Sequence, residues 1–114
     1  MSNDPPFQPR TVTIVGVGLI GGSLGLALKR RGVAETVIGV SRDETLTAAR
    51  ELGVIDDGYP YEAMAEGVAQ SDLVVLCTPI ARILELLPDA MSAATAGAIV
   101  CDVGSTKREI VTRA

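Results

Sequence analysis

The sequence predicts an α/β domain built on a parallel β-sheet with helices on both faces. Short apolar runs rich in valine and isoleucine alternate along the chain with longer segments that carry apolar residues at helical spacing. The 114 residues are 47% hydrophobic but only 3% aromatic, so aliphatic side chains must build the core. Strands buried on both faces have this composition, and strands separated by helices form right-handed βαβ units.

The first half of the chain contains two predicted strand–helix units. Thr11–Gly16 is expected to be a buried strand, and the helix after it spans Leu19–Arg31. A second strand covers residues 36–41, and its helix covers about Glu44–Leu52. A glycine follows each of these helices directly, and glycine is the residue that most often ends a helix.

The second half continues the alternation. The expected elements are a turn-rich piece with at most a short strand (residues 54–60), a weak helix (about Glu62–Val68), a strand (Asp72–Thr78), a helix, a fifth strand (residues 98–103) and a helix from Thr106. The helix after Asp72–Thr78 should have Thr78 as its N-cap and Pro79 as its first residue, and should break at Pro88. We therefore expect a doubly wound parallel sheet that is truncated after about five strands.

Length and charge limit the domain organisation and the partners. A chain of 114 residues forms one domain, which we assign to residues 11–114. Residues 1–10 contain three prolines and no apolar run, so they are expected to form a flexible tail rather than a signal peptide or a membrane helix. The net charge of −4, without a block of like charges, argues against nucleic acid or an anionic membrane as partner. We expect a cytoplasmic protein.

The run GVGLIGG lies between the first strand and the first helix and has the spacing G-x-G-x-x-G. Gly16 would allow the tight turn, Gly18 would let the backbone approach a pyrophosphate, and Gly21 would let the helix pack closely on the strand. The pyrophosphate would lie at the helix N-terminus, which favours an anion. This predicts a Rossmann-like dinucleotide-binding domain. The alternatives are a loop needed only for packing, or a site for another adenine nucleotide.

Ser41 and Arg42 stand at the end of the second strand, where NAD-binding domains usually carry an acidic residue. A hydroxyl and a guanidinium there would favour the 2′-phosphate of NADP. One charge-assisted hydrogen bond, at roughly 1.5–3 kcal/mol, corresponds to about a 10- to 150-fold preference. Alternatively, Ser41 and Glu44 form a capping box, Arg42 is merely solvated, and Asp43 holds the ribose of NAD.

The remaining reactive residues are few. Cys77 and Cys101 each end an apolar run and are too far apart in sequence for a CxxC motif, so we expect both to be small buried side chains. The chain contains no histidine, and we predict no metal site.

Several longer runs resemble one enzyme family. In order and spacing, VGVGLIGGSLGLALKRRG, VIGVSR, LGVID, DLVVLCTPI and GAIVCDVGSTKREIV are similar to the N-terminal half of the prephenate/arogenate dehydrogenases of tyrosine biosynthesis. The resemblance covers the chain from about Val12 to its end. It implies oxidation and decarboxylation of prephenate or arogenate, with hydride transfer to NADP or NAD.

The resemblance also implies roles for individual residues. The serine of the family's GS-[TV]-K motif lies in the active site, which makes Ser105 the candidate catalytic residue. Cofactor contacts are implied for Gly16, Gly18, Leu19, Ile20, Gly21, Ser41, Arg42, Cys77, Thr78 and Pro79. Family members with a Ser-Arg pair tend to use NADP. The structural alternatives are an N-cap role for Thr78 and a capping box of Thr106 with Glu109.

The sequence departs from the family in what it lacks. The catalytic histidine of the family lies about twenty residues beyond the serine, whereas this chain ends at Ala114. The helical C-terminal domain that forms the family's homodimer is also missing. We therefore expect a cofactor-binding fragment with almost no activity, since a general base contributes about 10²–10⁴-fold. The alternatives are another Rossmann dehydrogenase, such as the β-hydroxyacid group, and a non-catalytic nucleotide-binding module.

Overall fold

The computed structural model describes residues 9–102 and 108–110. In chain order the elements are β1 (Thr11–Val15), α1 (Leu19–Arg30), β2 (Thr36–Val40), α2 (Asp43–Glu51), β3 (Asp57–Tyr59), the 3₁₀ turn η1 (Tyr61–Ala63), α3 (Met64–Val68), β4 (Leu73–Leu76), α4 (Ile80–Ala93), β5 (Ile99–Asp102) and β6 (Arg108–Ile110). The predicted alternation of strands and helices is confirmed from β1 to β5, and most boundaries are shifted by one or two residues.

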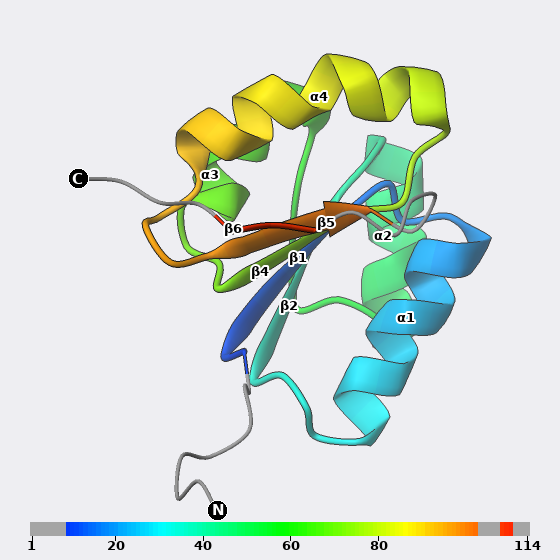
Figure 1. Ribbon diagram of the computed structural model, residues 1–114. Coiled ribbons are helices and arrows are strands. Elements are labelled where there is room, and N and C mark those ends of the chain that lie inside the picture. Colours follow the sequence, from blue (N-terminus) through cyan, green and yellow to red (C-terminus); the bar gives the residue numbers. More distant parts are fainter. Residues whose placement is uncertain (1–8, 103–107, 111–114) are drawn as a thin grey trace, which may run out of the picture.

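Six strands of the described chain form one sheet in the order β3-β2-β1-β4-β5-β6 (Figure 1). The first five strands are parallel, and β1 lies at the centre between β2 and β4. The chain winds outward from β1 to β3, then returns to the other side of β1 and winds outward again. This confirms the predicted doubly wound α/β fold.

The helices cover the sheet on both faces, with α1 and α2 on one side and α3 and α4 on the other (Figure 1). Successive side chains of β1 alternate between the two faces, as a strand requires. Val12 and Ile14 pack in the core under α1 and α2, whereas Val15 packs in the core under α3 and α4. All three are fully buried, which explains why the strand reads as a continuous apolar run.

The two helix ends predicted from glycine are confirmed. Gly32 and Gly53 have positive φ angles of 63° and 73°, and each follows the C-cap residue of its helix. The N–H of Val33 donates to the carbonyl of Leu28, and the N–H of Val54 donates to that of Ala49. A left-handed residue therefore lets the chain reverse while it satisfies the last carbonyls of the helix.

The prediction that Pro88 breaks its helix is wrong, because α4 runs through Pro88 without interruption. Proline in a helix interior costs about 3 kcal/mol. Burial compensates for this cost, since α4 packs Ile83, Leu86 and Ala90 into the core, while Pro88 itself is exposed. The loss of one hydrogen bond on the solvent side is thus tolerated.

The last element also differs from the expectation. Residues Arg108–Ile110 form strand β6, antiparallel to β5, where a helix was expected from Thr106. Thr106 itself lies outside the described residues. The sheet therefore has six strands rather than about five. Pairing supplies hydrogen-bond partners to the edge of β5, which would otherwise be exposed.

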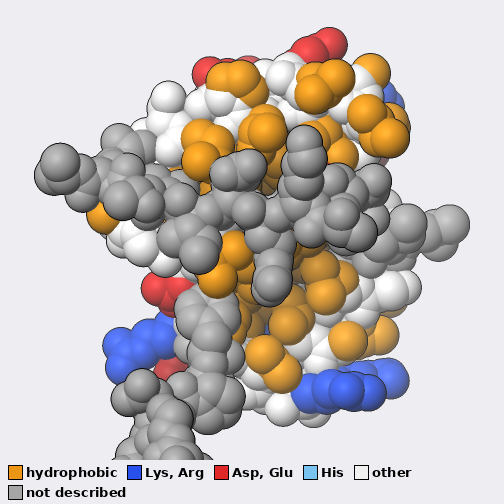
Figure 2. All heavy atoms as spheres, in the orientation of Figure 1, with side chains coloured by type: hydrophobic (Ala, Val, Ile, Leu, Met, Phe, Trp, Pro, Cys, Tyr) orange, Lys and Arg blue, Asp and Glu red, His pale blue; other side chains and the backbone are white. Residues whose placement is uncertain are grey.

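Two exposed apolar side chains lie on the outer surface of α4. Ile80 and Leu84 are 64% and 69% exposed, and they are four residues apart, which places them on the same side of the helix. Figure 2 shows apolar side chains gathered over this upper part of the molecule.

Within the described residues, no helix is both long enough and apolar enough to span a membrane.

Candidate functional site

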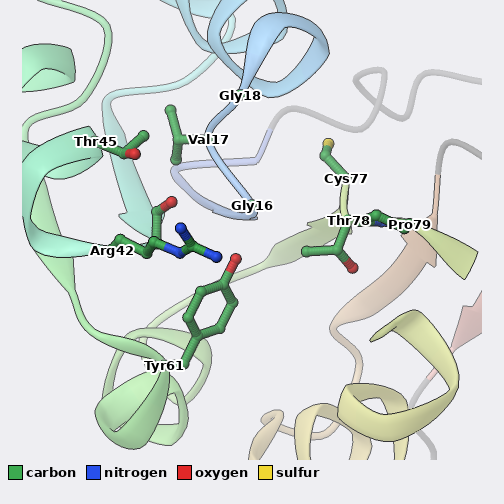
Figure 3. Close-up of a pocket in the computed structure, with 10 residues that line it drawn as sticks. Gly16, Val17, Gly18, Arg42, Thr45, Tyr61, Cys77, Thr78 and Pro79 are labelled. Carbon is green, nitrogen blue, oxygen red and sulfur yellow. The ribbon is translucent and has the colours of Figure 1, made fainter. Parts of the chain in front are cut away.

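A pocket of about 270 Å³ lies at the carboxyl ends of the parallel strands (Figure 3). Its walls come from the loop after β1, the ends of β2 and β4, and the segment after β3. The pocket is thus located where the winding of the sheet reverses, next to β1. Open α/β sheets bind their ligands in a crevice at this point.

The first wall is the glycine loop, and Gly16 is the residue that shapes it. Gly16 has a φ angle of +90°, and its N–H donates a 2.7 Å hydrogen bond to the carbonyl of Val40 at the end of β2. A Cβ atom on Gly16 would lie 2.6 Å from Cγ2 of Thr78, and one on Gly21 would lie 2.5 Å from the Gly16 carbonyl oxygen. Both positions therefore need glycine for the loop to pack between β1, β4 and α1.

Gly18 differs from the other two glycines of the motif. A Cβ atom there would meet nothing within 4 Å, so packing does not demand glycine at this position. Gly18 is the N-cap of α1 and supplies no side-chain cap, and the first turn of the helix contains no acidic residue. The positive end of α1 therefore faces the pocket without an anion from its own first turn.

The second wall is formed by Ser41, Arg42 and Thr45. Ser41 is only 6% exposed, and its N–H donates to the carbonyl of Tyr59 at 3.2 Å. Because Ser41 is held beside β3, α2 begins two residues later, with Arg42 as its N-cap and no side-chain capping bond. The alternative in which Ser41 and Glu44 form a capping box is therefore wrong.

The polar groups of this wall are available to a ligand. Among residues 9–102, no acidic side chain pairs with Arg42, and the Ser41 hydroxyl has no hydrogen-bond partner. In Figure 3 the guanidinium of Arg42 points across the pocket toward Gly16 and Tyr61. Thr45, which the sequence analysis missed, faces the pocket because it lies one helical turn after Arg42.

The third wall follows β4 and consists of Cys77, Thr78 and Pro79. The N–H of Cys77 donates to the carbonyl of Val15 at 2.8 Å, which joins this wall to the end of β1. Pro79 is the N-cap of α4, so the predicted cap at Thr78 is wrong by one residue. The Thr78 methyl group faces Gly16, and its buried hydroxyl, which points the other way, has no partner among the described residues (Figure 3).

The two cysteines are half-buried rather than buried, and both pack against the core under α1 and α2. Burial, with a smaller contribution from the nearby Cys101, raises the pKa of the Cys77 thiol to about 11. Cys77 therefore contributes a neutral thiol to the pocket at physiological pH, which makes it a small, weakly polar wall residue.

Tyr61 is a further pocket residue that the sequence analysis missed, as it also missed Val17 of the glycine loop. It lies two residues after β3, and its hydroxyl points toward the Arg42 guanidinium (Figure 3). The guanidinium carbon of Arg82, in the first turn of α4, lies 4.9 Å from the centre of the Tyr61 ring. The signal that could have identified Tyr61 is strand β3. If residues 57–59 had been predicted as a strand, Tyr61 would have been expected at the carboxyl edge of the sheet, where the pocket lies.

The remaining predicted residues have different positions. Gly21 is buried against Gly16 and Ile14, behind the loop. Leu19 and Ile20 begin α1 directly after Gly18, and their side chains lie outside the described part of the chain. Ser105 also lies outside the described residues, so its predicted catalytic role is untested.

Comparison with known proteins identifies similar sequences. A family model described as "Prephenate dehydrogenase, nucleotide-binding domain" matches residues 24–114. Prephenate dehydrogenase of Bacillus subtilis is 38% identical over 103 residues, which cover 89% of this chain and 27% of that protein. The chain thus spans about a quarter to a third of the length of the curated relatives it matches.

Solved structures agree with this result. The arogenate dehydrogenase of Synechocystis superposes with a TM-score of 0.75 at 36% identity, covering 85% of this chain and 34% of that one. The prephenate dehydrogenase of Aquifex aeolicus, in complex with hydroxyphenyl propionate and NAD+, has a TM-score of 0.74 at 29% identity, covering 82% of this chain and 32% of that one. The family and fold predicted from the sequence motifs are confirmed.

Proposed function

We propose a function from the premise that this chain belongs to the family of prephenate dehydrogenase nucleotide-binding domains. The chain binds a nicotinamide dinucleotide in the pocket at the carboxyl ends of β1, β2 and β4. The observation that carries this proposal is that the glycine loop at the N-terminus of α1 and Arg42, which has no acidic partner among residues 9–102, line the same pocket.

The residues present fit such a cofactor. The pyrophosphate would be held at Gly18, where the backbone carries no side chain and the space beside it is open. The adenosine ribose would lie at the end of β2, beside Ser41 and Arg42. Cys77, Thr78 and Pro79 would border the cofactor on the β4 side.

We further propose a preference for NADP over NAD. Arg42 offers a cation that has no acidic partner among residues 9–102, and the buried Ser41 offers a hydroxyl beside it. Both donate hydrogen bonds, and a 2′-phosphate is a better acceptor for them than a ribose hydroxyl. Asp43 remains the alternative partner, which would hold the ribose of NAD instead.

In the complete protein, the proposed reaction is the oxidative decarboxylation of prephenate or arogenate. The bound nicotinamide would supply the hydride acceptor for this reaction. Ser105 is proposed to donate or accept a hydrogen bond at the substrate hydroxyl. Because the chain contains no histidine, the 114 residues alone should bind the cofactor and have little activity. Further proposals are a homodimer for the full-length protein, a cytoplasmic location, and residues 11–114 as the cofactor domain.

The test is a titration of the chain with NADPH and NADH, followed by cofactor fluorescence and repeated on Arg42→Ala. The wild-type chain should bind NADPH roughly tenfold or more tightly than NADH, and the variant should bind both alike. Arg30→Ala is the matched control, since Arg30 is an exposed arginine in the last turn of α1, about 18 Å along the helix from Gly18.

The possible outcomes separate the two parts of the proposal. If neither cofactor binds to the folded chain, nicotinamide dinucleotide binding is wrong. If both bind equally, or NADH binds more tightly, only the NADP preference is wrong and Arg42 is a solvated residue. An equal loss in Arg30→Ala would show that the effect is one of net charge rather than of a specific contact.

A further inference from the structure

We propose that Tyr61, held in place by Arg82, is the wall that determines how tightly the pocket binds the adenylate end of its cofactor. This inference rests on the proposed function and assigns it two residues that no motif identifies. Tyr61 would touch the ligand, whereas Arg82 would act through Tyr61 as a positioning residue.

The first step is the contact between Tyr61 and Arg82. Tyr61 begins the turn η1, and Arg82 lies in the first turn of α4, with its guanidinium carbon 4.9 Å from the ring centre. This distance is within the range of a cation–π interaction. The Nη1 of Arg82 also donates a 2.8 Å hydrogen bond to Oε2 of Glu85, one turn further along α4. A residue of the same helix, Glu85, therefore holds the guanidinium of Arg82 in position over the Tyr61 ring.

The second step concerns the space on either side of the ring. Tyr61 lines the pocket described above and also a neighbouring pocket of about 360 Å³, which is bordered by Met64, Asp89 and Ala93. The half-buried ring thus separates two hollows. If the ring were removed or turned away, the cofactor pocket would open into its neighbour and lose its wall on that side.

The third step identifies the part of the cofactor that would meet this wall. The pyrophosphate belongs at Gly18 and the ribose at Arg42, so the adenine lies beyond the ribose on the Arg42 side. Tyr61 is on that side, with its hydroxyl directed toward the Arg42 guanidinium (Figure 3). A flat base packs well against an aromatic ring, and such contacts do not depend on a phosphate.

Arg82 and Arg42 should therefore have different effects on binding. The charge of Arg82 is balanced by Glu85, and its side chain covers the ring, so it should influence NADPH and NADH alike. Arg42 is unpaired among residues 9–102 and should influence NADPH alone. This difference is the basis of the test.

The experiment measures dissociation constants of the 114-residue chain for NADPH and NADH, together with urea unfolding without ligand. Tyr61→Ala should weaken both cofactors by the same factor, roughly three- to tenfold. Arg82→Gln should weaken both by about two- to fivefold. Tyr61→Phe keeps the aromatic ring and Arg82→Lys keeps the cation, so each variant should retain most of the wild-type affinity.

Glu85→Gln is the matched control. It breaks the exposed pair with Arg82 but leaves the cation over the ring, so both affinities should stay within about twofold of wild type. The unfolding midpoint of Tyr61→Phe and Arg82→Gln without ligand should remain close to wild type. A loss of stability without any loss of affinity would show a merely structural role and would overturn the inference.

Two further results would also overturn it. One is unchanged affinity in Tyr61→Ala and Arg82→Gln while the wild-type chain binds cofactor, which would leave the proposed function standing. The other is a loss restricted to NADPH, which would place Tyr61 at the 2′-phosphate instead. Failure of the wild-type chain to bind either cofactor would reject the proposed function and the inference together.

Discussion

Gly16 and Thr78 are packed so closely that a Cβ atom on Gly16 would lie 2.6 Å from Cγ2 of Thr78. Gly16 follows β1 and Thr78 follows β4, the two strands between which the winding of the sheet reverses. The contact therefore sets the separation of two walls of the pocket. It also shows that one glycine of the motif is required by packing, irrespective of any ligand.

Gly16→Ala should lower the free energy of unfolding by at least about 2 kcal/mol. The variant combines the strain of a side chain at a φ angle of +90° with a contact that real Cβ atoms do not make. Urea unfolding followed by circular dichroism measures this loss, and cofactor affinity should fall with it. A stability within 0.5 kcal/mol of wild type, on the order of a neutral surface change, would show that the loop relaxes freely.

Gly18→Ala is the matched variant in the same loop. Gly18 has a φ angle of −104° and open space at its Cβ position, so stability should change by less than about 1 kcal/mol. The added methyl group would nevertheless occupy the space through which a pyrophosphate approaches the backbone. Titration should therefore show weaker binding of NADPH and NADH in a chain that is still folded. Unchanged affinity would contradict the assignment of the pyrophosphate to Gly18.

The carboxylate of Asp56 should make stability depend on pH. Burial alone would raise its pKa, but the hydrogen bond from Lys29, the N–H of Val37 and the charge of Lys29 together lower the pKa below its ordinary value of 3.8. The contribution to stability is therefore present above this value and is lost as the pH falls through the folded-state pKa.

Asp56→Asn tests this dependence. The variant should be less stable than wild type at pH 7, and the difference should shrink as the pH is lowered below 3.8. Urea unfolding at several pH values measures it, and Lys29→Met should reduce the same pH-dependent part. The stability difference between Asp56→Asn and wild type could instead stay constant down to a pH of about 2.5, or even about 1.5. That result would mean that Asp56 acts through shape rather than charge.

Cys77 should react slowly with alkylating reagents at neutral pH. Burial and the nearby Cys101 raise its pKa to about 11, so only about one thiol in a thousand is ionised at pH 8. The rate of modification by iodoacetamide, followed by peptide mass spectrometry, should rise about tenfold per pH unit up to pH 10. NADPH should slow it further, since Cys77 lines the pocket. Rapid labelling at pH 7 would refute the raised pKa.

The fold could be predicted because its signals are local. Apolar runs buried on both faces, helical spacing and the glycines at positions 32 and 53 each act within a few residues of chain. The family could be predicted equally well, because its motifs are contiguous runs of sequence. The pocket residues Gly16, Gly18, Ser41 and Arg42 follow from the same rule, since each stands just after a strand.

The errors share a different cause. The capping box considered as an alternative for Ser41, the break predicted at Pro88 and the helix expected from Thr106 all rest on local preferences of about 1–3 kcal/mol. Within the described residues, contacts between segments that are distant in sequence outweigh these local preferences. Ser41 is held by Tyr59, α4 is held by its buried face, and Arg108–Ile110 pairs with β5.

The amino-acid sequence was sufficient to predict the order of the elements as far as β5, the doubly wound class of the sheet, the family and the glycine loop. These features depend on periodicity and on backbone conformations available to single residues. Three features required the three-dimensional structure: Tyr61 borders the pocket, Arg82 covers its ring, and β6 pairs with the edge of β5. Each of these requires two segments to meet that no local pattern relates, so their placement follows from the packing of the whole domain.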